Sequence, residues 1–264
     1  KISKKTKAIV IVHLYGYAAD VFKIKKYLKN KKIKIIEDCA QAFGAEIKGK
    51  KVGTIGDFSC YSFHAQKNLT TLGEGGAIYV KDKSLFKKVK GLRHNGHSNF
   101  KKRKFYWLPA MGNLELDLID KLPFKATLSE IQCASGHLLL KRIDQLNKKR
   151  ISRARKFISH FKHNDVLSFN ESFLKKRHVY HLLSAYVKPS KNFNRNTLIK
   201  ELYDNYQIKC ATQYYPLYKY SLFKKYGYGK GKCLNTEKFY NNMISFPFHV
   251  WMSEKNFDYM ISSV

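Results

Sequence analysis

Two charged residues, Asp38 and Lys67, follow stretches of sequence that are typical of buried parallel strands. Ligands of open α/β sheets bind at the carboxyl ends of such strands, so we expect both side chains to face one crevice. An acid and an amine that meet there allow two interpretations. One is a partly buried Lys–Asp ion pair with a structural role, which spacing alone favours. The other is a pyridoxal phosphate (PLP) site, in which the lysine forms a Schiff base and the aspartate keeps the pyridine nitrogen protonated.

The elements that must position these two residues alternate between strand and helix along the first part of the chain. Short apolar, β-prone stretches predict strands, and stretches with apolar residues three or four apart predict helices. The predicted strands are 8–13, 34–37, 58–63 and 77–80, the predicted helices are 20–30 and 84–93, and a glycine-rich hairpin is expected at 48–57. This alternation predicts an α/β layered domain with a mostly parallel sheet.

The second part of the chain predicts a smaller α+β domain. A long apolar stripe predicts a helix over 129–161, which starts at Ser129 and bridges the two domains. Beyond it we expect strands and helices in alternation, with strands at 178–187 and 208–215 and helices at 195–206, 236–243 and 254–262. The predicted domains are therefore 1–128 for the large one and 129–264 for the bridging helix and the small one.

Four short motifs lie in order over the region that contains Asp38 and Lys67. They are E-D-C-A-Q at 37–41, G-D at 56–57, S-F-H-A-Q-K-N at 62–68 and G-E-G-G at 73–76. Together they closely resemble the DegT/DnrJ/EryC1/StrS family of PLP-dependent sugar aminotransferases. The resemblance implies a fold-type I PLP-transferase, with a large α/β domain and a smaller C-terminal α+β domain. The family has a further N-terminal part ahead of the point that matches Lys1, and we expect the PLP-binding domain here to be partial.

The resemblance implies a role for four residues of these motifs. Lys67 would be the catalytic lysine, which forms the Schiff base with PLP and then moves a proton, and Asp38 would pair with the pyridinium nitrogen. Gln41 would approach the ring and its phenolic oxygen, and the hydroxyl of Ser62 would bind the cofactor phosphate. Some family members remove a hydroxyl group instead and carry histidine at the lysine position, so Lys67 favours transamination.

The same resemblance places three further residues near the cofactor. His64 and Asn68 flank the lysine and are expected near the ring. Thr127 takes the place of an asparagine that, in the family, reaches across the dimer to the other subunit's cofactor phosphate. Threonine also donates a hydrogen bond but reaches less far. The resemblance thus implies a homodimer with a shared site.

In the C-terminal part, three residues fall in segments that resemble stretches of the family's small domain, and we expect them to contact the substrate. Tyr215 and Tyr218 belong to Y-Y-P-L-Y at 214–218, where Tyr218 replaces a histidine, and His249 ends S-F-P-F-H at 245–249. Core packing is the alternative for these aromatic segments. The segment 94–123 either lines the sugar pocket or decorates the surface.

The reaction that the resemblance implies has two halves. An amino acid, expected to be L-glutamate, gives its amino group to the cofactor, and a keto-sugar, expected to be nucleotide-linked, then accepts it. The product would enter cell-surface polysaccharide or other amino-sugar biosynthesis. Two alternatives stay open: a PLP-dependent sugar dehydratase-like enzyme, and a non-catalytic or truncated member of the same scaffold.

Composition argues against several other classes of protein. The 51 Lys and Arg against 19 Asp and Glu give a net charge of +32. Lysines occur throughout, however, and no arginine stripe alternates with aromatics, which disfavours nucleic-acid binding. The positive field would instead attract an anionic sugar. No apolar run is long enough to span a membrane. The five cysteines are scattered without a C-x-x-C pair, so we expect neither a metal site nor disulfides, and a cytoplasmic location.

Overall fold

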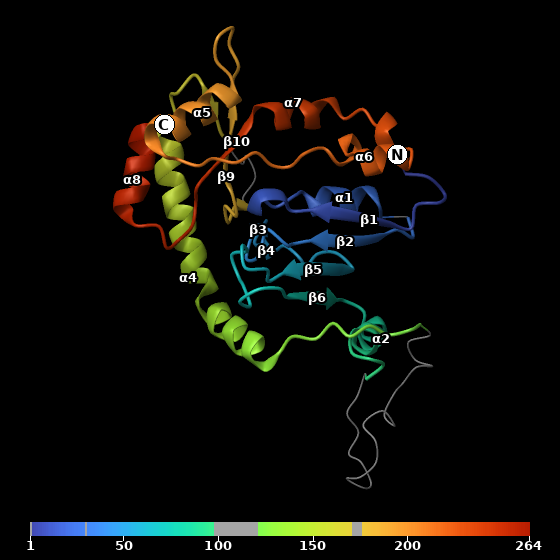
Figure 1. Ribbon diagram of the computed structural model, residues 1–264. Coiled ribbons are helices and arrows are strands. Elements are labelled where there is room, and N and C mark those ends of the chain that lie inside the picture. The colour runs from blue at the N-terminus through green and yellow to red at the C-terminus, as the bar shows by residue number, and fades with distance from the viewer. Residues whose placement is uncertain (1, 30, 98–120, 171–175) are drawn as a thin grey trace, which may run out of the picture. The chain divides into compact units, whose positions relative to one another are not determined.

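The computed structural model describes residues 2–29, 31–97, 121–170 and 176–264 (Figure 1). Most of the irregular segment predicted at 94–123 therefore lies outside the described residues. The chain forms two compact units, Lys1–Ile143 and Asp144–Val264. The domain boundary expected after residue 128 stays a prediction. Among the described residues, no helix is both long and apolar enough to cross a membrane.

The first unit is built on a four-stranded sheet. Its strands, in the order β1-β2-β5-β6, are β1 (Ala8–Val12), β2 (Lys34–Asp38), β5 (Phe58–Ser62) and β6 (Gly76–Val80). The first three run parallel, and β6 runs antiparallel to β5 (Figure 1). Helix α1 (Val21–Tyr27) connects β1 to β2, and α2 (Lys83–Arg93) follows β6. The predicted α/β fold with a mostly parallel sheet is confirmed.

Capping carboxylates explain where the two helices of this sheet begin. Asp20 accepts a hydrogen bond from the Lys23 backbone N–H at 3.0 Å, before α1. Asp82 accepts from the N–H groups of Ser84 and Leu85 at 2.8 and 2.9 Å, before α2. Each carboxylate satisfies N–H groups that the first turn of a helix leaves without an intrahelical partner.

The register of the parallel strands brings their carboxyl ends to one edge of the sheet. Val12 at the end of β1 pairs with Asp38 at the end of β2, and Asp38 pairs with Cys60 of β5. The segments that follow these three strands therefore start from the same edge. We call it the carboxyl edge, and the residues at it or just beyond it that matter below are Asp38, Gln41, Ser62 and Lys67.

The predicted hairpin lies slightly earlier than expected. Strands β3 (Glu46–Ile47) and β4 (Lys50–Lys51) are antiparallel and are joined by Lys48 and Gly49, whose φ angles are 51° and 73°. Two left-handed residues are what a tight two-residue hairpin turn requires. The later glycines instead belong to a separate turn at 53–56, which wraps a buried carboxylate.

Helix α4 (Glu130–His160) confirms the predicted long helix. Ser129 and Gln132 cap its start reciprocally: the Gln132 N–H donates to Ser129 Oγ at 3.3 Å, and the Ser129 N–H donates to Gln132 Oε1 at 2.9 Å. Gln132 Nε2 also donates to the Glu74 carbonyl at 2.8 Å. The helix start is thereby tied to the G-E-G-G motif.

The second unit packs helices against a three-stranded antiparallel sheet. Its order is β10-β9-β7, with β7 (Leu167–Ser168), β9 (Leu183–Val187) and β10 (Met243–Phe246). The helices are the C-terminal part of α4, α5 (Arg195–Tyr206), α7 (Leu234–Asn242) and α8 (Glu254–Ser263). Shorter elements are β8 (Lys176–Arg177), η3 (Leu217–Lys219), α6 (Ser221–Lys225) and η4 (Tyr228–Lys230). Phe157, Ile244 and Phe257 are completely buried in the common core.

The strand predicted at 208–215 is wrong. This segment meets β10 at one point, where Ala211 and Ser245 exchange backbone hydrogen bonds of 3.0 and 2.8 Å. Two residues later the Gln213 N–H bonds to Met243 Sδ at 3.1 Å instead of to a backbone carbonyl. The ladder therefore does not continue, although the residues are β-prone.

Candidate active site

Asp38 is the last residue of β2 and is half-buried at the carboxyl edge. Its Oδ1 accepts a hydrogen bond from the Ala40 N–H at 3.0 Å. An ionised carboxylate offers about four acceptor positions, so this bond leaves capacity for a further donor. The chemistry of Asp38 suits a positively charged N–H group that approaches the edge.

Gln41 is held by the segment that follows β1. That segment contains the short helix η1 (Leu14–Gly16), and the Tyr15 N–H donates to Gln41 Oε1 at 2.7 Å. Because a backbone N–H must face an oxygen, this bond assigns the two ends of the side-chain amide. Gln41 therefore acts as a donor through Nε2.

Ser62 and His64 lie where β5 leaves the sheet. Ser62 Oγ accepts from the His64 N–H at 3.3 Å, and a hydroxyl that accepts can still donate its own proton. The His64 ring is occupied locally, because Nδ1 accepts from the Gln66 N–H at 3.1 Å and Nε2 lies 3.5 Å from Glu74 Oε1. In this structure His64 stabilises its own turn, and its predicted contact with the cofactor stays a prediction.

Lys67 is half-buried in the connection between β5 and β6, just beyond the carboxyl edge. Its backbone N–H donates to the His64 carbonyl at 2.9 Å. Thr71 closes the connection: its N–H donates to the Phe63 carbonyl at 2.9 Å, and its hydroxyl lies 3.3 Å from the Glu74 carbonyl. The lysine thus sits in a closed loop, together with Asn68.

Two glycines of the G-E-G-G motif are needed for this closure. A Cβ on Gly75 would lie 2.2 Å from Thr71 Oγ1, and a Cβ on Gly76 would lie 2.6 Å from the Tyr61 carbonyl oxygen. Any side chain at either position would push the Lys67 loop away from β5. The two glycines therefore allow the close packing of the segments that surround Lys67.

Neither Asp38 nor Lys67 takes part in an ion pair within the part of the chain that the structure describes. The Lys–Asp pair that spacing alone favoured is therefore not formed between these two residues.

Glu37, the neighbour of Asp38, is a buried anion with four hydrogen-bond donors. Its side chain is completely buried. Oε2 accepts from the Gly53 N–H at 2.8 Å and from His13 Nε2 at 3.0 Å, and Oε1 accepts from the N–H groups of Ile55 at 2.8 Å and Gly56 at 2.6 Å. Burial by itself raises the pKa of Glu37, but these four hydrogen bonds outweigh it and hold the pKa below its usual range.

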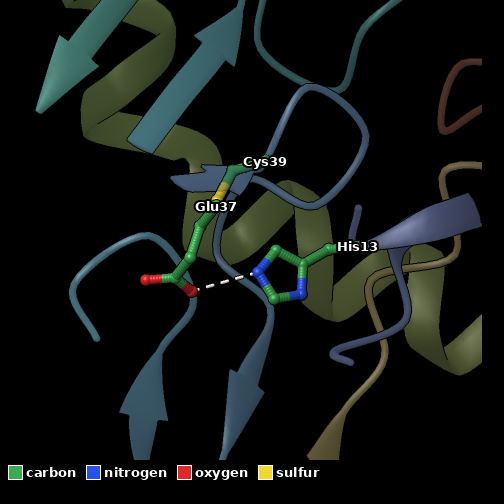
Figure 2. Close-up of side chains that lie close together, drawn as sticks. All are labelled: His13, Glu37 and Cys39. Carbon is green, nitrogen blue, oxygen red and sulfur yellow. Dashed lines mark hydrogen bonds and ion pairs between the residues drawn. The ribbon is translucent and has the colours of Figure 1, made fainter. Parts of the chain in front are cut away.

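Figure 2 shows the His13 ring reaching from the end of β1 to the Glu37 carboxylate, with Cys39 beside them. The three side chains are metal-ligand types, and their ligand atoms lie within 4.8 Å of one another. These atoms are already engaged, because the Ala19 N–H donates to His13 Nδ1 at 3.1 Å and burial raises the pKa of the Cys39 thiol, which keeps it protonated. We assign no metal to the cluster. We call His13, Glu37 and the 53–56 turn the buried anchor.

The G-D motif has a structural role at the opposite end of the strands. Asp57 Oδ2 accepts from the Ile35 N–H at 2.9 Å. A Cβ on Gly56 would lie 2.9 Å from the Ile35 carbonyl oxygen, so only glycine allows this approach. The motif fixes the start of β5 against the start of β2.

Tyr218, predicted to contact the substrate, is engaged within the second unit. Its hydroxyl donates to Glu237 Oε1 at 2.5 Å, and Lys219 Nζ pairs with Glu237 Oε2 at 2.6 Å. The hydrogen bond to Glu237 raises the pKa of Tyr218. The contact with a sugar that the resemblance implies stays a prediction.

The other two predicted substrate residues also lie in the second unit. Tyr215 is 40% exposed and packs edge-on against Tyr220, with 4.8 Å between ring centroids. The side chain of His249 is exposed, and its carbonyl accepts from Arg153 Nη1 at 3.1 Å. Thr127, predicted to reach a second subunit, is exposed ahead of α4 in the first unit. Neither a sugar contact nor a subunit contact is tested by these positions.

Sequence reasoning missed the residues that hold the carboxyl edge in place. Glu37, His13, Tyr15 and Thr71 bind no predicted ligand, but each fixes a segment that carries a predicted site residue. The pattern in the sequence that could have identified Glu37 and His13 is a polar residue inside, or at the end of, an otherwise apolar strand. Glu37 lies inside one such run and His13 ends another.

The side chains of the carboxyl edge fit PLP by their chemistry. An amine, a carboxylate with spare acceptor capacity, an amide that donates and a hydroxyl that donates are the four kinds of group that its aldehyde, pyridine nitrogen, phenolic oxygen and phosphate need. All four lie on segments that start from one edge of the sheet.

Similarity to known proteins covers the whole chain. The sequence model of the DegT/DnrJ/EryC1/StrS aminotransferase family matches residues 1–264. An uncharacterised protein of Methanocaldococcus jannaschii is 31% identical over 100% of this chain and 67% of its own length. The UDP-4-amino-4,6-dideoxy-N-acetyl-beta-L-altrosamine transaminase of Campylobacter jejuni is 31% identical over 94% of this chain and 62% of its own length.

Solved structures agree with this match. Helicobacter pylori PseC, an aminotransferase involved in the biosynthesis of pseudoaminic acid, superposes with a TM-score of 0.85 at 30% identity, over 99% of this chain and 67% of that chain. This chain therefore spans about two thirds of the length of these relatives.

Proposed function

The chain belongs to the DegT/DnrJ/EryC1/StrS aminotransferase family, as its motifs predict, and from this premise we propose that it is a sugar aminotransferase that uses PLP. The observation that carries the proposal is the position of Lys67. Lys67 is half-buried in a closed loop that starts from the same sheet edge as Asp38. A lysine and an aspartate so placed, without an ion pair between them, are suited to hold the two ends of one ligand.

Lys67 would hold the cofactor and, within each half-reaction, would use Nζ to move a proton from or to the substrate carbon. Bound PLP supplies an electron sink, which stabilises the negative charge left when a proton is removed from the substrate carbon. Thr71 and the glycines of the G-E-G-G motif keep closed the loop that carries Lys67. Holding a reacting group in place in this way is itself a large part of catalysis.

Three other residues would orient the cofactor. Asp38 would accept from the pyridine nitrogen and keep its proton in place. Gln41 would donate through Nε2 to the phenolic oxygen, since its Oε1 already accepts from the Tyr15 N–H. Ser62 would donate its hydroxyl proton to a phosphate oxygen.

The remaining predicted contacts belong to the same proposal. His64 and Asn68 would line the cofactor on either side of Lys67. Thr127 would face a second subunit in a homodimer, and Tyr215, Tyr218 and His249 would contact the sugar.

For the substrate we propose a nucleotide-linked keto-sugar, with an amino acid, by resemblance L-glutamate, as the amino donor. The name of the Campylobacter jejuni relative, a transaminase of a UDP-linked amino sugar, supports this class. The net charge of +32 would draw a negatively charged diphosphate towards the protein. We place the product in the biosynthesis of cell-surface polysaccharide or related amino sugars, in the cytoplasm.

The test is the transfer of nitrogen. The protein is incubated with PLP, ¹⁵N-labelled L-glutamate and a panel of nucleotide-linked keto-sugars, and the products are analysed by mass spectrometry. We expect a labelled amino sugar and 2-oxoglutarate in equal amounts. Loss of a hydroxyl group from the sugar without incorporation of the label would instead support the dehydratase alternative. No change in any sugar, with no oxoglutarate, would support a non-catalytic member of the scaffold.

A further inference from the structure

The turn after β1 adopts a backbone conformation that its sequence does not favour. Tyr15 has φ 59° and ψ 11°, which is left-handed, and Gly16 follows with φ 91°. Glycine adopts such angles readily, but a bulky residue does so only where its surroundings enforce it. The Tyr15 side chain is buried, at 8% exposure. Enforced conformations of this kind are concentrated at functional sites.

The His13 ring ties the two ends of this turn to the sheet. The Ala19 N–H donates to His13 Nδ1 at 3.1 Å, so this nitrogen carries no proton. The proton of the neutral ring is then on Nε2, which lies 3.0 Å from Glu37 Oε2 and donates to it. The bond to Ala19 thus selects the tautomer that can reach Glu37.

Glu37 can serve this turn only as an anion. Its two oxygens accept from His13 and from three backbone N–H groups of the 53–56 turn. All four partners are donors, so a side chain with a donating NH₂ in place of one oxygen would set donor against donor. The buried anchor therefore joins the turn after β1 to the turn before β5.

The turn after β1 contacts Gln41 directly. The Tyr15 N–H, aimed by the left-handed turn, holds Gln41 Oε1 at 2.7 Å. A different conformation of the 13–19 segment would move the Tyr15 N–H away from Gln41 Oε1 and remove this hydrogen bond. The turn thus determines which end of Gln41 acts as donor towards the carboxyl edge.

We propose that Glu37 and His13 are positioning residues for Gln41. Acting through the left-handed turn at Tyr15, the buried pair sets the orientation of the amide that meets the cofactor. This inference rests on the proposed function for the identity of the cofactor, but the mechanical link from Glu37 to Tyr15 does not.

The first test needs no cofactor. In the complete protein, Glu37→Gln is compared with Glu201→Gln, an exposed site on α5, by amide hydrogen exchange. We expect peptides that cover Tyr15 and the 53–56 turn to exchange about tenfold faster or more in the Glu37 variant, and to exchange before the peptides of β1 and β2 do. Unchanged exchange at Tyr15 would overturn the link, and the Glu201 variant should match the parent throughout.

The second test reads the orientation of Gln41. The absorbance of bound PLP is followed against pH, because a hydrogen bond to the phenolic oxygen alters the pH at which the bound chromophore titrates. We expect the midpoint to move by about one pH unit in Glu37→Gln and in Gln41→Leu, in the same direction. A normal midpoint in Glu37→Gln, with faster exchange at Tyr15, would mean that the anchor has a structural role alone and would overturn the proposal.

A rescue separates positioning from general loss of structure. Tyr15→Gly keeps the N–H donor and removes the penalty for the left-handed angle, so the turn can form with less help from the anchor. In the double variant Glu37→Gln/Tyr15→Gly we expect the midpoint to return most of the way to that of Tyr15→Gly alone. No return would show that Glu37 acts by another route. If the parent protein fails to bind PLP at all, the proposed function fails, whereas the exchange result still decides whether the anchor holds the turn.

Discussion

The buried anchor and the carboxyl edge contain neighbouring carboxylates with opposite surroundings. Glu37 is completely buried and accepts from four N–H donors, whereas Asp38 is half-buried and accepts from the Ala40 N–H. Successive residues of a strand point to opposite sides, which is how one step along β2 separates the two environments. An anion whose acceptor positions are all used fixes structure, and an anion with capacity left can bind a ligand. The E-D pair of the motif thus combines a carboxylate that stabilises the fold, Glu37, with a carboxylate that is suited to bind a ligand, Asp38.

The largest effect that would sharpen this contrast is expected at the carboxyl edge. Lys67→Ala should reduce amino transfer by about 10⁴-fold or more, because no other group would hold the cofactor and move the proton. The free energy of unfolding should change by less than about 1 kcal/mol, since Lys67 takes part in no ion pair among the described residues. Steady-state kinetics and urea unfolding measure the two quantities. Lys88→Ala, on the exposed side of α2, is the control, and an equal loss of activity there would contradict the assignment.

The anchor should show the reverse pattern. Glu37→Gln keeps the size of the side chain but places an NH₂ group against N–H donors. We expect the free energy of unfolding to fall by about 3–5 kcal/mol, as when one partner of a buried charge network is lost. Urea unfolding followed by circular dichroism gives the value. A loss below about 1 kcal/mol would break the comparison, because Glu37 would then behave like a surface residue.

Asp38→Asn tests the other acid of the comparison, which we expect to matter for activity and not for stability. It should reduce amino transfer by about 10²–10³-fold, because an amide holds the proton of the pyridine nitrogen less well than a carboxylate. Its free energy of unfolding should stay within about 1 kcal/mol of the parent value. The decisive comparison is, for each variant, the loss of amino transfer against the loss of unfolding free energy. Asp38→Asn should affect mainly activity, and Glu37→Gln mainly stability. If both variants lost activity and stability in the same proportion, the distinction between a structural Glu37 and a cofactor-binding Asp38 would be contradicted.

The smallest expected effect is the pH dependence of the anchor. The pKa of Glu37 is held below its ordinary value of 4.5. A depressed pKa stabilises the folded state above the unfolded-state value, and that contribution is lost as the pH falls through the folded-state value. The difference in unfolding free energy between the parent and Glu37→Gln should therefore be constant at neutral pH and shrink below about pH 4.5, by at most about 1.4 kcal/mol per pH unit. Urea titrations at several pH values would show it, and a difference that grows in acid would contradict the sign.

The carboxyl edge could be predicted from the sequence because it depends on simple patterns. Apolar runs predict β1, β2 and β5, parallel strands end together, and the residues just beyond the ends of β2 and β5 include Gln41 and Lys67. The motif resemblance then suggested which of these residues meet a cofactor. Helix α4 was predictable for the same reason, since its apolar stripe is long and its start is capped.

The anchor could not be predicted, because its contacts join segments that are distant in the sequence. That Glu37 is an anchored anion depends on the 53–56 turn wrapping it, and no local pattern signals this. The left-handed conformation of Tyr15 costs about 1–3 kcal/mol and runs against propensity. The strand predicted at 208–215 was wrong for a similar reason. Pairing with β10 stops after Ala211, and the Gln213 N–H bonds to Met243 Sδ, a contact between distant segments that no local pattern signals.

The most direct test of the proposed role of Lys67 is to locate the cofactor on the chain. The complete protein is incubated with PLP and reduced with borohydride, and the modified peptides are mapped by mass spectrometry. We expect one pyridoxyl adduct, on Lys67, which is absent from Lys67→Ala and present in Lys88→Ala. An adduct on another lysine, or none on the parent protein, would contradict the assignment of Lys67 and with it the proposed aminotransferase.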